Sequence, residues 1–470
     1  MEMTTAQVWQ MVAAAMVLLM TPALAFFYGG MTRAKSTLNM MMMSFASVGI
    51  VGVLWVLWGY STAYGGTSAG GLFGNPFTAF GLKGLLSGDT FDAGVLINVG
   101  YQATFAIITV ALISGAIADR AKFGAWSLFV PLWVTLAYCP IAFWVWGGGI
   151  LSADGAIGSW AGAAIDFAGG TVVHINAGVA GLVLALILGK RKGFGVDPRQ
   201  RPHNIPLVML GAAVLWFGWF GFNGGAAAEA GQAGLIWINT MAAPGAAMIG
   251  WLLTERVRDG RPTSLGAASG LVAGLVAITP ACANVSPVGA IFLGLVSGVA
   301  SALAVGLKYR WGFDDSLDVV GVHLVSGLVG TLALGFIAVP VDGEGGGLFY
   351  GGGVHQLVAQ LVACLVAMAW TGIVTAALGL AIHKTMGFRV SEEAERVGID
   401  LAEHAETAYE FGGLGTGSRM VPHPATSSHL RPAAPVPAAP VAVAPVAVAP
   451  APAVADPGKT LDSSTPDQEK

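Results

Sequence analysis

Residues 169–181 read GGTVVHINAGVAG, and residues 319–330 read VVGVHLVSGLVG. In each segment a Val-His pair, ending at His174 or His323, is followed by glycine four and seven residues later. In a helix those glycines lie on or beside the face of the histidine, so a neighbouring backbone can approach closely there. The recurrence indicates two related halves whose histidines meet.

The composition around these segments indicates a polytopic membrane protein. Of 470 residues, 55% are hydrophobic and only 10% are charged, which is too few charges for a soluble domain of this size. Runs of about twenty apolar residues predict eleven spans, at about 6–28, 38–60, 96–118, 125–146, 169–189, 205–223, 234–253, 263–281, 287–307, 318–340 and 354–385.

The positions of the two histidines divide these spans into halves. His174 falls in the fifth span and His323 in the tenth, so the halves cover about residues 6–189 and 205–340. An odd number of spans per half inverts the second copy, as in many transporters whose substrate path follows the repeat interface. We predict an all-α integral membrane domain over residues 1–390, with a 5+5 inverted repeat and a long eleventh helix at 354–385.

Basic residues fall in alternate loops, and the intervening loops hold only Lys83. By the positive-inside rule the basic loops are cytoplasmic, which places the N-terminus outside and the C-terminus in the cytoplasm. The prediction is a multi-pass protein of the cell membrane. The basic loop residues are Arg33, Lys35, Arg120, Lys122, Lys190, Arg191, Lys192, Arg199, Arg201, Arg256, Arg258, Arg261, Lys308 and Arg310.

The two ends of the chain differ in character. Ala23-Leu24-Ala25 resembles a signal-peptide cleavage site, but the residues before the apolar run carry a glutamate and no positive charge, so we interpret the run as the first spanning helix. Residues 391–411 form a charged cytoplasmic segment. Residues 415–470, rich in alanine, proline and valine without periodicity, are typical of a disordered tail.

An ionisable ring in hydrocarbon is expensive and marks a functional site by default, although a satisfied core histidine is the alternative for either ring alone. Two neutral rings in contact share protons as a coupled pair and offer nitrogen lone pairs and N–H groups to a narrow lumen. Such a lumen suits a small neutral molecule, and it excludes potassium because few oxygens replace its water. The other histidines are loop, tail or flanking residues: His203, His355, His383, His404, His423 and His429.

Aromatic residues gather near the predicted outer ends of several spans. Tyr101 and Phe105 are four residues apart and share a helix face. Trp146 ends the fourth span, and Trp219 and Phe222 lie at the end of the sixth. An interfacial aromatic belt explains each one alone, whereas together they can form a π cage for a small cation. A π cage outside attracts a cation, whereas a dry histidine pore inside admits only a neutral molecule. The transported cation must therefore be able to lose a proton, and ammonium is the common ion that can do so.

Acidic residues precede both histidine segments. Asp166 stands eight residues before His174, where it can cap the helix or attract cations to the outer mouth. Asp318, five residues before His323, is the analogous predicted cap on the cytoplasmic side. The three cysteines, Cys139, Cys282 and Cys364, lie in apolar segments at no metal or disulfide spacing, so we expect no metal site.

These residues are also those by which the chain resembles the ammonium transporter family, the Amt/Mep/Rh group, and its bacterial Amt branch in particular. The resemblance covers roughly residues 8–411 and implies eleven helices in a homotrimer with one pore per subunit. The matching segments are FYGGMTRAKS, ATFAIITVALISGAIADR, DFAGGTVVHINAGVAGL, GWFGFNGG, ITPACA, DVVGVH and ERVGIDLAEHAETAY.

The resemblance implies a role for each site residue. His174 and His323 resemble the family's twin pore histidines, and Phe105 and Phe222 its stacked gate at the outer entrance, with Trp219 also among the pore residues. The family's external ammonium cage is matched in this chain by Trp146 with Phe105 and Tyr101. Asp166 resembles the buried aspartate beneath the cage.

Two departures from the family pattern affect the cage. Tyr101 stands where many relatives have phenylalanine, which keeps the π face. Ala226 stands where the family often has a serine whose hydroxyl accepts a hydrogen bond from ammonium. We therefore expect weaker external recruitment of ammonium.

Residues 391–411 resemble the family's regulatory C-terminus, which couples to a cytosolic PII signalling protein. A charged juxtamembrane helix without a partner is the alternative. The matching positions are Glu395, Gly398, Asp400, His404 and Tyr409, with Ala405 where others have glycine.

The predicted function is ammonium uptake, in which the ion is recruited outside and deprotonated, and ammonia passes the histidines with or without a separate proton. The chain is not expected to be an enzyme, to carry a cofactor or to bind nucleic acid, and a gradient must drive transport. A low-flux ammonium sensor and an Rh-like gas channel are alternatives. A bis-histidine haem protein is a further one, but it would need more intramembrane histidines and basic residues for the haem propionates.

Overall fold

The computed structural model describes residues 3–68, 70–86, 93–197, 201–340 and 346–409, all within one unit, Met1–Phe411. The predicted tail at 415–470, the loop residue Arg199 and the last two residues of the 391–411 segment lie outside the described residues. The described part is almost entirely helical, since its strands are limited to the short pair β1 (Thr67–Ser68) and β2 (Phe73–Gly74).

Ten helical segments in the described residues are long and apolar enough to cross a membrane, which confirms a multi-pass all-α membrane protein. The predicted span at 263–281 corresponds to α11 (Ser264–Ile278), whose 15 residues fall short of the usual spanning length of about 20. The ten segments are Thr5–Met31, Ala34–Tyr64, Gly94–Ile117, Phe123–Trp146, Gly170–Leu188, Ile205–Gly224, Ala230–Arg258, Pro287–Trp311, Val320–Ile337 and His355–Thr385.

Within these segments the regular α-helices are often interrupted by wider or tighter turns. The helices are α1 (Thr5–Met31), α2 (Thr37–Leu54), α3 (Tyr60–Tyr64), α4 (Ala93–Ile113), α5 (Phe123–Trp133), α6 (Cys139–Trp146), α8 (Asn176–Leu188), α9 (Ile205–Gly224), α10 (Ala230–Arg258), α12 (Pro287–Trp311), α13 (Val325–Ile337) and α14 (His355–Thr385). Short helices lie outside the spans: α7 (Gly158–Ala161), α15 (Glu392–Val397) and α16 (Ile399–His404).

Four spans contain a π-helical turn: η2 (Trp55–Gly59), η5 (Val134–Tyr138), η6 (Gly170–Ile175) and η8 (Val320–Leu324). Single π turns interrupt the regular hydrogen-bond ladder and are frequent at functional sites. Both predicted pore histidines lie in such turns, His174 in η6 and His323 in η8. The two halves therefore share a local backbone irregularity as well as a sequence pattern.

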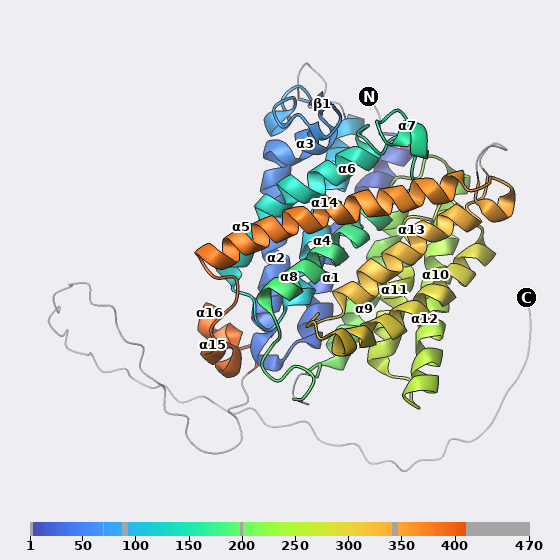
Figure 1. Ribbon diagram of the computed structural model, residues 1–470. Coiled ribbons are helices and arrows are strands. Elements are labelled where there is room, and N and C mark those ends of the chain that lie inside the picture. Colours follow the sequence, from blue (N-terminus) through green and yellow to red (C-terminus); the bar gives the residue numbers. More distant parts are fainter. Residues whose placement is uncertain (1–2, 69, 87–92, 198–200, 341–345, 410–470) are drawn as a thin grey trace, which may run out of the picture. The chain divides into compact units, whose positions relative to one another are not determined.

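Small residues bring the helix backbones together. A Cβ at Gly218 of α9 would lie 2.2 Å from Met20 Cγ of α1, and one at Gly298 of α12 would lie 2.0 Å from the carbonyl oxygen of Ala247 in α10. Such close approaches replace hydrophobic driving force as the source of helix association in a bilayer. In Figure 1, α14 lies obliquely along the bundle, where it packs on α5, α8 and α13.

The two ends of the bundle differ in chemistry. We call the end that holds α3 and α7 the aromatic end, and the end that holds α15 and α16 the basic end. Figure 1 shows α3 and α7 at one end and α15 and α16 at the other. At the basic end Arg191 pairs with Asp314 at 2.9 Å and with Asp119 at 3.1 Å, so buried ion pairs join the loops there.

Candidate functional site

The rings of His174 and His323 meet inside the bundle. Their Nδ1 atoms are 3.3 Å apart, the ring centroids are 5.4 Å apart and the planes differ by 15°. Both side chains are buried, with 1% and 3% of their surface exposed. In such a contact one neutral ring donates an N–H and the other accepts it, so the pair is held by a single shared proton.

Glycines next to the histidines make this contact possible. A Cβ at Gly178 would lie 2.6 Å from the backbone nitrogen of Leu324, and one at Gly327 would lie 3.3 Å from His174 Cβ. Each glycine is four residues after its histidine, and each faces the helix of the other half. The structure thus confirms the close backbone approach that the repeated spacing predicts.

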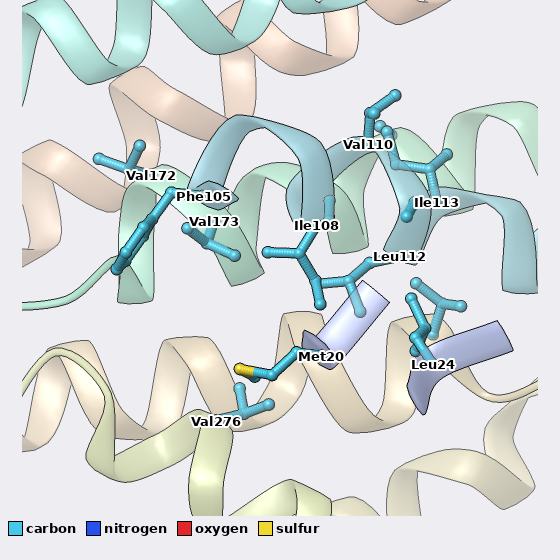
Figure 2. Close-up of a cluster of buried hydrophobic side chains, with 14 of the residues drawn as sticks. Met20, Leu24, Phe105, Ile108, Val110, Leu112, Ile113, Val172, Val173 and Val276 are labelled. Carbon is cyan, nitrogen blue, oxygen red and sulfur yellow. The ribbon is translucent and has the colours of Figure 1, made fainter. Parts of the chain in front are cut away.

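The histidines line a narrow cavity, which we call the histidine cavity, with a volume of about 10 Å³. This is roughly the space for one water-sized molecule. Figure 2 shows part of its wall, with Met20 and Leu24 of α1 beside Ile108 and Leu112 of α4. The complete lining is Met20, Leu24, Phe27, Ile108, Leu112, Val173, His174, Leu215, Trp219, Phe222, Val272 and His323.

Trp219 extends the stack of rings. Its indole lies 5.6 Å from the His174 ring with an interplanar angle of 17°, and its Nε1–H donates to Thr279 Oγ1 at 2.8 Å. The Nε2 atom of His174 has no hydrogen-bond partner among the residues that the structure describes. Thr279 belongs to the quoted segment ITPACA, but no local pattern in the sequence connects its hydroxyl with the tryptophan.

Phe105 and Phe222 lie between the histidine cavity and the aromatic end. Their rings stack with centroids 4.2 Å apart and an angle of 20°, and the Phe222 ring is 6.2 Å from that of His174. Phe222 lines the histidine cavity, whereas Phe105 lines a second cavity on the other side. The stack therefore separates two cavities.

The second cavity, which we call the aromatic cavity, has a volume of about 440 Å³ and opens at the aromatic end. The edges of Tyr101 and Trp146 approach Phe105 at 4.9 Å and 6.1 Å between ring centroids. The structure thus brings together the three predicted cage residues and also Ala226. The aromatic cavity is lined by Tyr64, Asn98, Tyr101, Gln102, Phe105, Val145, Trp146, Phe167 and Ala226.

Sequence reasoning missed two polar members of this cavity, Tyr64 and Gln102. Within the described part of the chain, the buried hydroxyl of Tyr64 and the buried amide oxygen of Gln102 have no hydrogen-bond partner. Gln102 sits between the two aromatic residues of the YQATF segment, so its place next to the cage could have suggested a polar contact. Tyr64 comes from a distant helix, and no local pattern points to it.

Asp166 caps the turn that carries His174. Its carboxylate accepts hydrogen bonds from the backbone N–H groups of Gly169, Gly170, Thr171 and Val172, at 2.5–3.1 Å. Burial raises the pKa of this carboxyl to about 6, and the four hydrogen bonds oppose the rise. Trp146 Nε1–H donates to the backbone oxygen of Asp166 at 2.8 Å, so the cap also holds the cage tryptophan.

The cap of the other half is Asp315, and the prediction of Asp318 is wrong. The Asp315 carboxylate accepts from the N–H groups of Val319 at 3.0 Å and Val320 at 2.7 Å. Asp318 has a positive φ of 64°, and its side chain instead accepts from Lys308 Nζ at 2.6 Å. Asp315 is eight residues before His323, the same spacing as Asp166 to His174, so the capping position is repeated.

The predicted regulatory residues contact the rest of the chain at the basic end. The Asp400 carboxylate accepts from the backbone N–H groups of Leu38 and Asn39 at 3.0 and 2.8 Å, and so caps the start of α2. His404 Nε2 lies 3.0 Å from Asn39 Oδ1. Tyr409 contacts His203 Nε2 through its hydroxyl at 2.8 Å.

Glu395 and Gly398 complete this contact. The buried carboxylate of Glu395 accepts from the backbone N–H of Lys192 at 2.6 Å and from Arg389 at 2.7 Å. Gly398 has a φ of 134°, and a Cβ there would lie 2.9 Å from the carbonyl oxygen of Lys35. All five predicted residues are therefore placed on one docked segment.

The sequence model of the Ammonium Transporter Family matches residues 8–409. The chain belongs to the ammonium transporter family. An ammonium transporter of Mycobacterium tuberculosis (strain ATCC 25618 / H37Rv) is 54% identical to this transporter over 442 residues, which cover 88% of this chain and 92% of that protein. Family membership and the spanning helices together establish a multi-pass membrane protein.

Solved structures agree with this assignment of the transporter. A structure described as a sensor Amt protein gives a TM-score of 0.77 at 29% identity, and covers 85% of this chain and 98% of that chain. Mep2 of Saccharomyces cerevisiae gives a TM-score of 0.74 at 34% identity, with coverage of 83% and 88%. The fold is thus that of Amt and Mep proteins.

Proposed function

We propose that this transporter recruits ammonium in the aromatic cavity, removes its proton near the Phe105–Phe222 stack and conducts ammonia past His174 and His323. The family and its named relatives support ammonium as the substrate. The finer mechanism is argued from the contrast between the two cavities. In this proposal the aromatic end faces outside and the basic end faces the cytoplasm.

The contact between His174 and His323 in an otherwise apolar cavity carries the proposal. A bare cation in a space of about 10 Å³ lined by aliphatic and aromatic groups would lose its hydration without replacement, which is costly. A neutral ammonia molecule keeps its hydrogen bonds by using imidazole nitrogens as partners. The unpartnered Nε2 of His174 is one such group.

The aromatic cavity suits the charged form. The π faces of Trp146, Tyr101 and Phe105 attract a small cation, and the unpartnered oxygens of Tyr64 and Gln102 can accept its N–H groups. Passage from this cavity to the histidines requires displacement of the stacked rings. The stack is therefore the proposed point at which an ammonium N–H bond breaks: the proton passes to water of the open aromatic cavity, and ammonia moves on past the rings.

The test is charge movement in proteoliposomes on a solid-supported membrane after an ammonium jump, with an equal potassium jump as control. A saturable ammonium current without a potassium current supports selective transport with a separate proton. Internal alkalinisation without current would reduce the proposal to passage of neutral ammonia. Absence of both signals would overturn transport as the function.

An ammonium sensor with little flux is the second candidate, because one structural neighbour is described as a sensor Amt protein. In that case ammonium would bind in the aromatic cavity but the stack would rarely open. Binding measured by tryptophan fluorescence, together with absent current in the same preparation, would favour this reading. A half-saturation concentration for the ammonium current that matches the dissociation constant for ammonium binding would exclude the sensor function.

We further propose that the transporter assembles as a homotrimer and that a cytosolic PII signalling protein binds at the basic end. The family supports the trimer, and the docked segment with Glu395, Asp400 and His404 supports the PII site, because a partner bound to this segment would act on α2 and on the loop after α8. Native mass spectrometry of the purified protein, with and without a PII protein, tests both claims. A monomer, or no complex, would contradict them.

A further inference from the structure

Tyr101 lines the aromatic cavity, and its hydroxyl is engaged by backbone carbonyls of α9. Tyr101 lies on α4, one turn before Phe105, and is only 1% exposed. Its hydroxyl lies 2.7 Å from the carbonyl oxygen of Phe222 and 3.3 Å from that of Gly221. The phenol therefore donates a hydrogen bond to the backbone of the opposite gate residue.

The receiving carbonyl is one that needs a donor. Helix α9 ends at Gly224, and the last four carbonyls of a helix have no partner within the helix. The carbonyl of Gly221 accepts from the N–H of Gly225 at 2.8 Å, and that of Gly224 accepts from Trp9 Nε1 at 2.8 Å. Tyr101 supplies the partner for the carbonyl of Phe222, so side chains from α1 and α4 cap the end of α9.

The local sequence makes room for this phenol. A Cβ at Gly225 would lie 2.5 Å from Tyr101 Cε2, so the ring packs directly on the backbone that follows α9. The same ring contacts Phe105 edge-on at 4.9 Å and 67°. One side chain therefore touches both members of the stack: the ring of Phe105 and the backbone of Phe222.

We infer that Tyr101 is a positioning residue of the gate, whose hydroxyl holds the backbone of Phe222 so that its ring stays stacked on Phe105. Phenylalanine at this position would keep the π face of the cavity but would leave the carbonyl of Phe222 without its donor. The end of α9 would then move more freely, and the stack would part more readily. This inference rests on the proposed role of the stack as a gate.

The variant Tyr101→Phe tests the consequence for transport, with Tyr138→Phe as a matched loss of a buried phenol hydroxyl in η5. We expect the ratio of methylammonium to ammonium transport to rise about fivefold, the factor that corresponds to one neutral hydrogen bond. The apparent affinity for ammonium should not change, because the cavity keeps its π faces. A change in affinity alone, or an equal effect of Tyr138→Phe, would overturn the inference.

A direct measurement keeps this result separate from the transport proposal. Phe222–Asn223 is the only Phe–Asn pair in the sequence, so labelling with carbonyl-¹³C phenylalanine and ¹⁵N asparagine isolates the Phe222 carbonyl by solid-state NMR. Its shift should move upfield in Tyr101→Phe and stay constant in Tyr138→Phe. An unmoved shift refutes the hydrogen bond, and a moved shift with unchanged selectivity refutes its role at the gate. If the wild type itself carries no ammonium, the proposed function fails, while the shift still decides whether Tyr101 holds Phe222.

Discussion

Asp166 and Asp315 each lie eight residues before a histidine of the central pair, and each accepts backbone hydrogen bonds at the start of the turn that carries that histidine. The two carboxylates lie toward opposite ends of the bundle. The histidine contact is thus held by two equivalent local structures that enter from opposite sides. This arrangement leads to the first two predictions.

Asp315→Ala should destabilise the protein more than Asp318→Asn. The first change removes the acceptor of two buried N–H groups and should cost about 1–2 kcal/mol. The second change keeps an oxygen that accepts from the buried Lys308 ammonium and keeps a residue type that tolerates the φ of 64°, so it should cost about 0.5 kcal/mol. Thermal unfolding in detergent ranks the two variants, and a greater loss in Asp318→Asn would contradict the assignment of the cap.

Asp315 should also make stability depend on pH in a direction opposite to that of a salt-bridged carboxylate. Burial raises its pKa to about 6 from the ordinary 3.8, so the folded state binds this proton more tightly than the unfolded state. The stability of the wild type should therefore fall, relative to Asp315→Asn, as the pH rises from about 4 to 6, and then stay level. Unfolding midpoints of both proteins across pH 4–8 give the difference, and a constant difference would refute this coupling.

Ala226→Ser should strengthen recruitment in the aromatic cavity. The side chain at position 226 lines this cavity, and a hydroxyl there would add an acceptor for an ammonium N–H. We expect the apparent affinity to rise about threefold to tenfold, which corresponds to about 0.6–1.4 kcal/mol, the ordinary net contribution of one added hydrogen bond. Ala226→Val is the control for added volume. An unchanged half-saturation concentration in the serine variant would sink the prediction.

His174→Ala should lower the saturable ammonium current by roughly tenfold or more, because the histidine cavity loses a hydrogen-bonding wall and the partner of His323. Val173→Ala changes the same cavity lining without removing a polar group and serves as the control. Equal currents in both variants would show that the histidine contact is structural only.

Gly398→Ala should release the docked segment at the basic end. Its φ of 134° disfavours any side chain, and the new Cβ would press on the backbone of Lys35. Limited proteolysis should cut the variant earlier after residue 390 than the wild type. Ala408→Gly, in the same segment, gives the control rate. If Gly398→Ala resists protease as well as the wild type does, the backbone there is not strained.

Much of this architecture is predictable from the sequence because hydropathy and glycine spacing act locally. The spans follow from apolar length, and the meeting of His174 with His323 follows from the repeated Val-His and glycine pattern. The contacts that the sequence does not predict depend on the backbone conformation of single residues. Asp318 lies nearer to His323 in the sequence than Asp315 does, but its own left-handed backbone, with a φ of 64°, places its carboxylate against Lys308 and not at the start of the turn.

The sequence does not predict the polar contacts of the two cavities, for a related reason. Tyr64 and Thr279 reach the site from helices distant in sequence, so no periodicity relates them to Trp146 or Trp219. The sequence shows Tyr101 only as a change from phenylalanine that keeps the π face. Its donation to Phe222 depends on where α9 ends, which hydropathy alone does not fix to one residue.

Each half of the molecule supplies only one of the two rings that touch at 3.3 Å. A single half, expressed alone, would expose its lone imidazole and the bare backbone beside its glycine, with nothing to complete either. A break in the link between α8 and α9 removes no pore residue. Only the two fragments together, however, can form the contact between the histidines. We therefore expect two co-expressed fragments to restore ammonium transport by complementation, and neither fragment alone to do so.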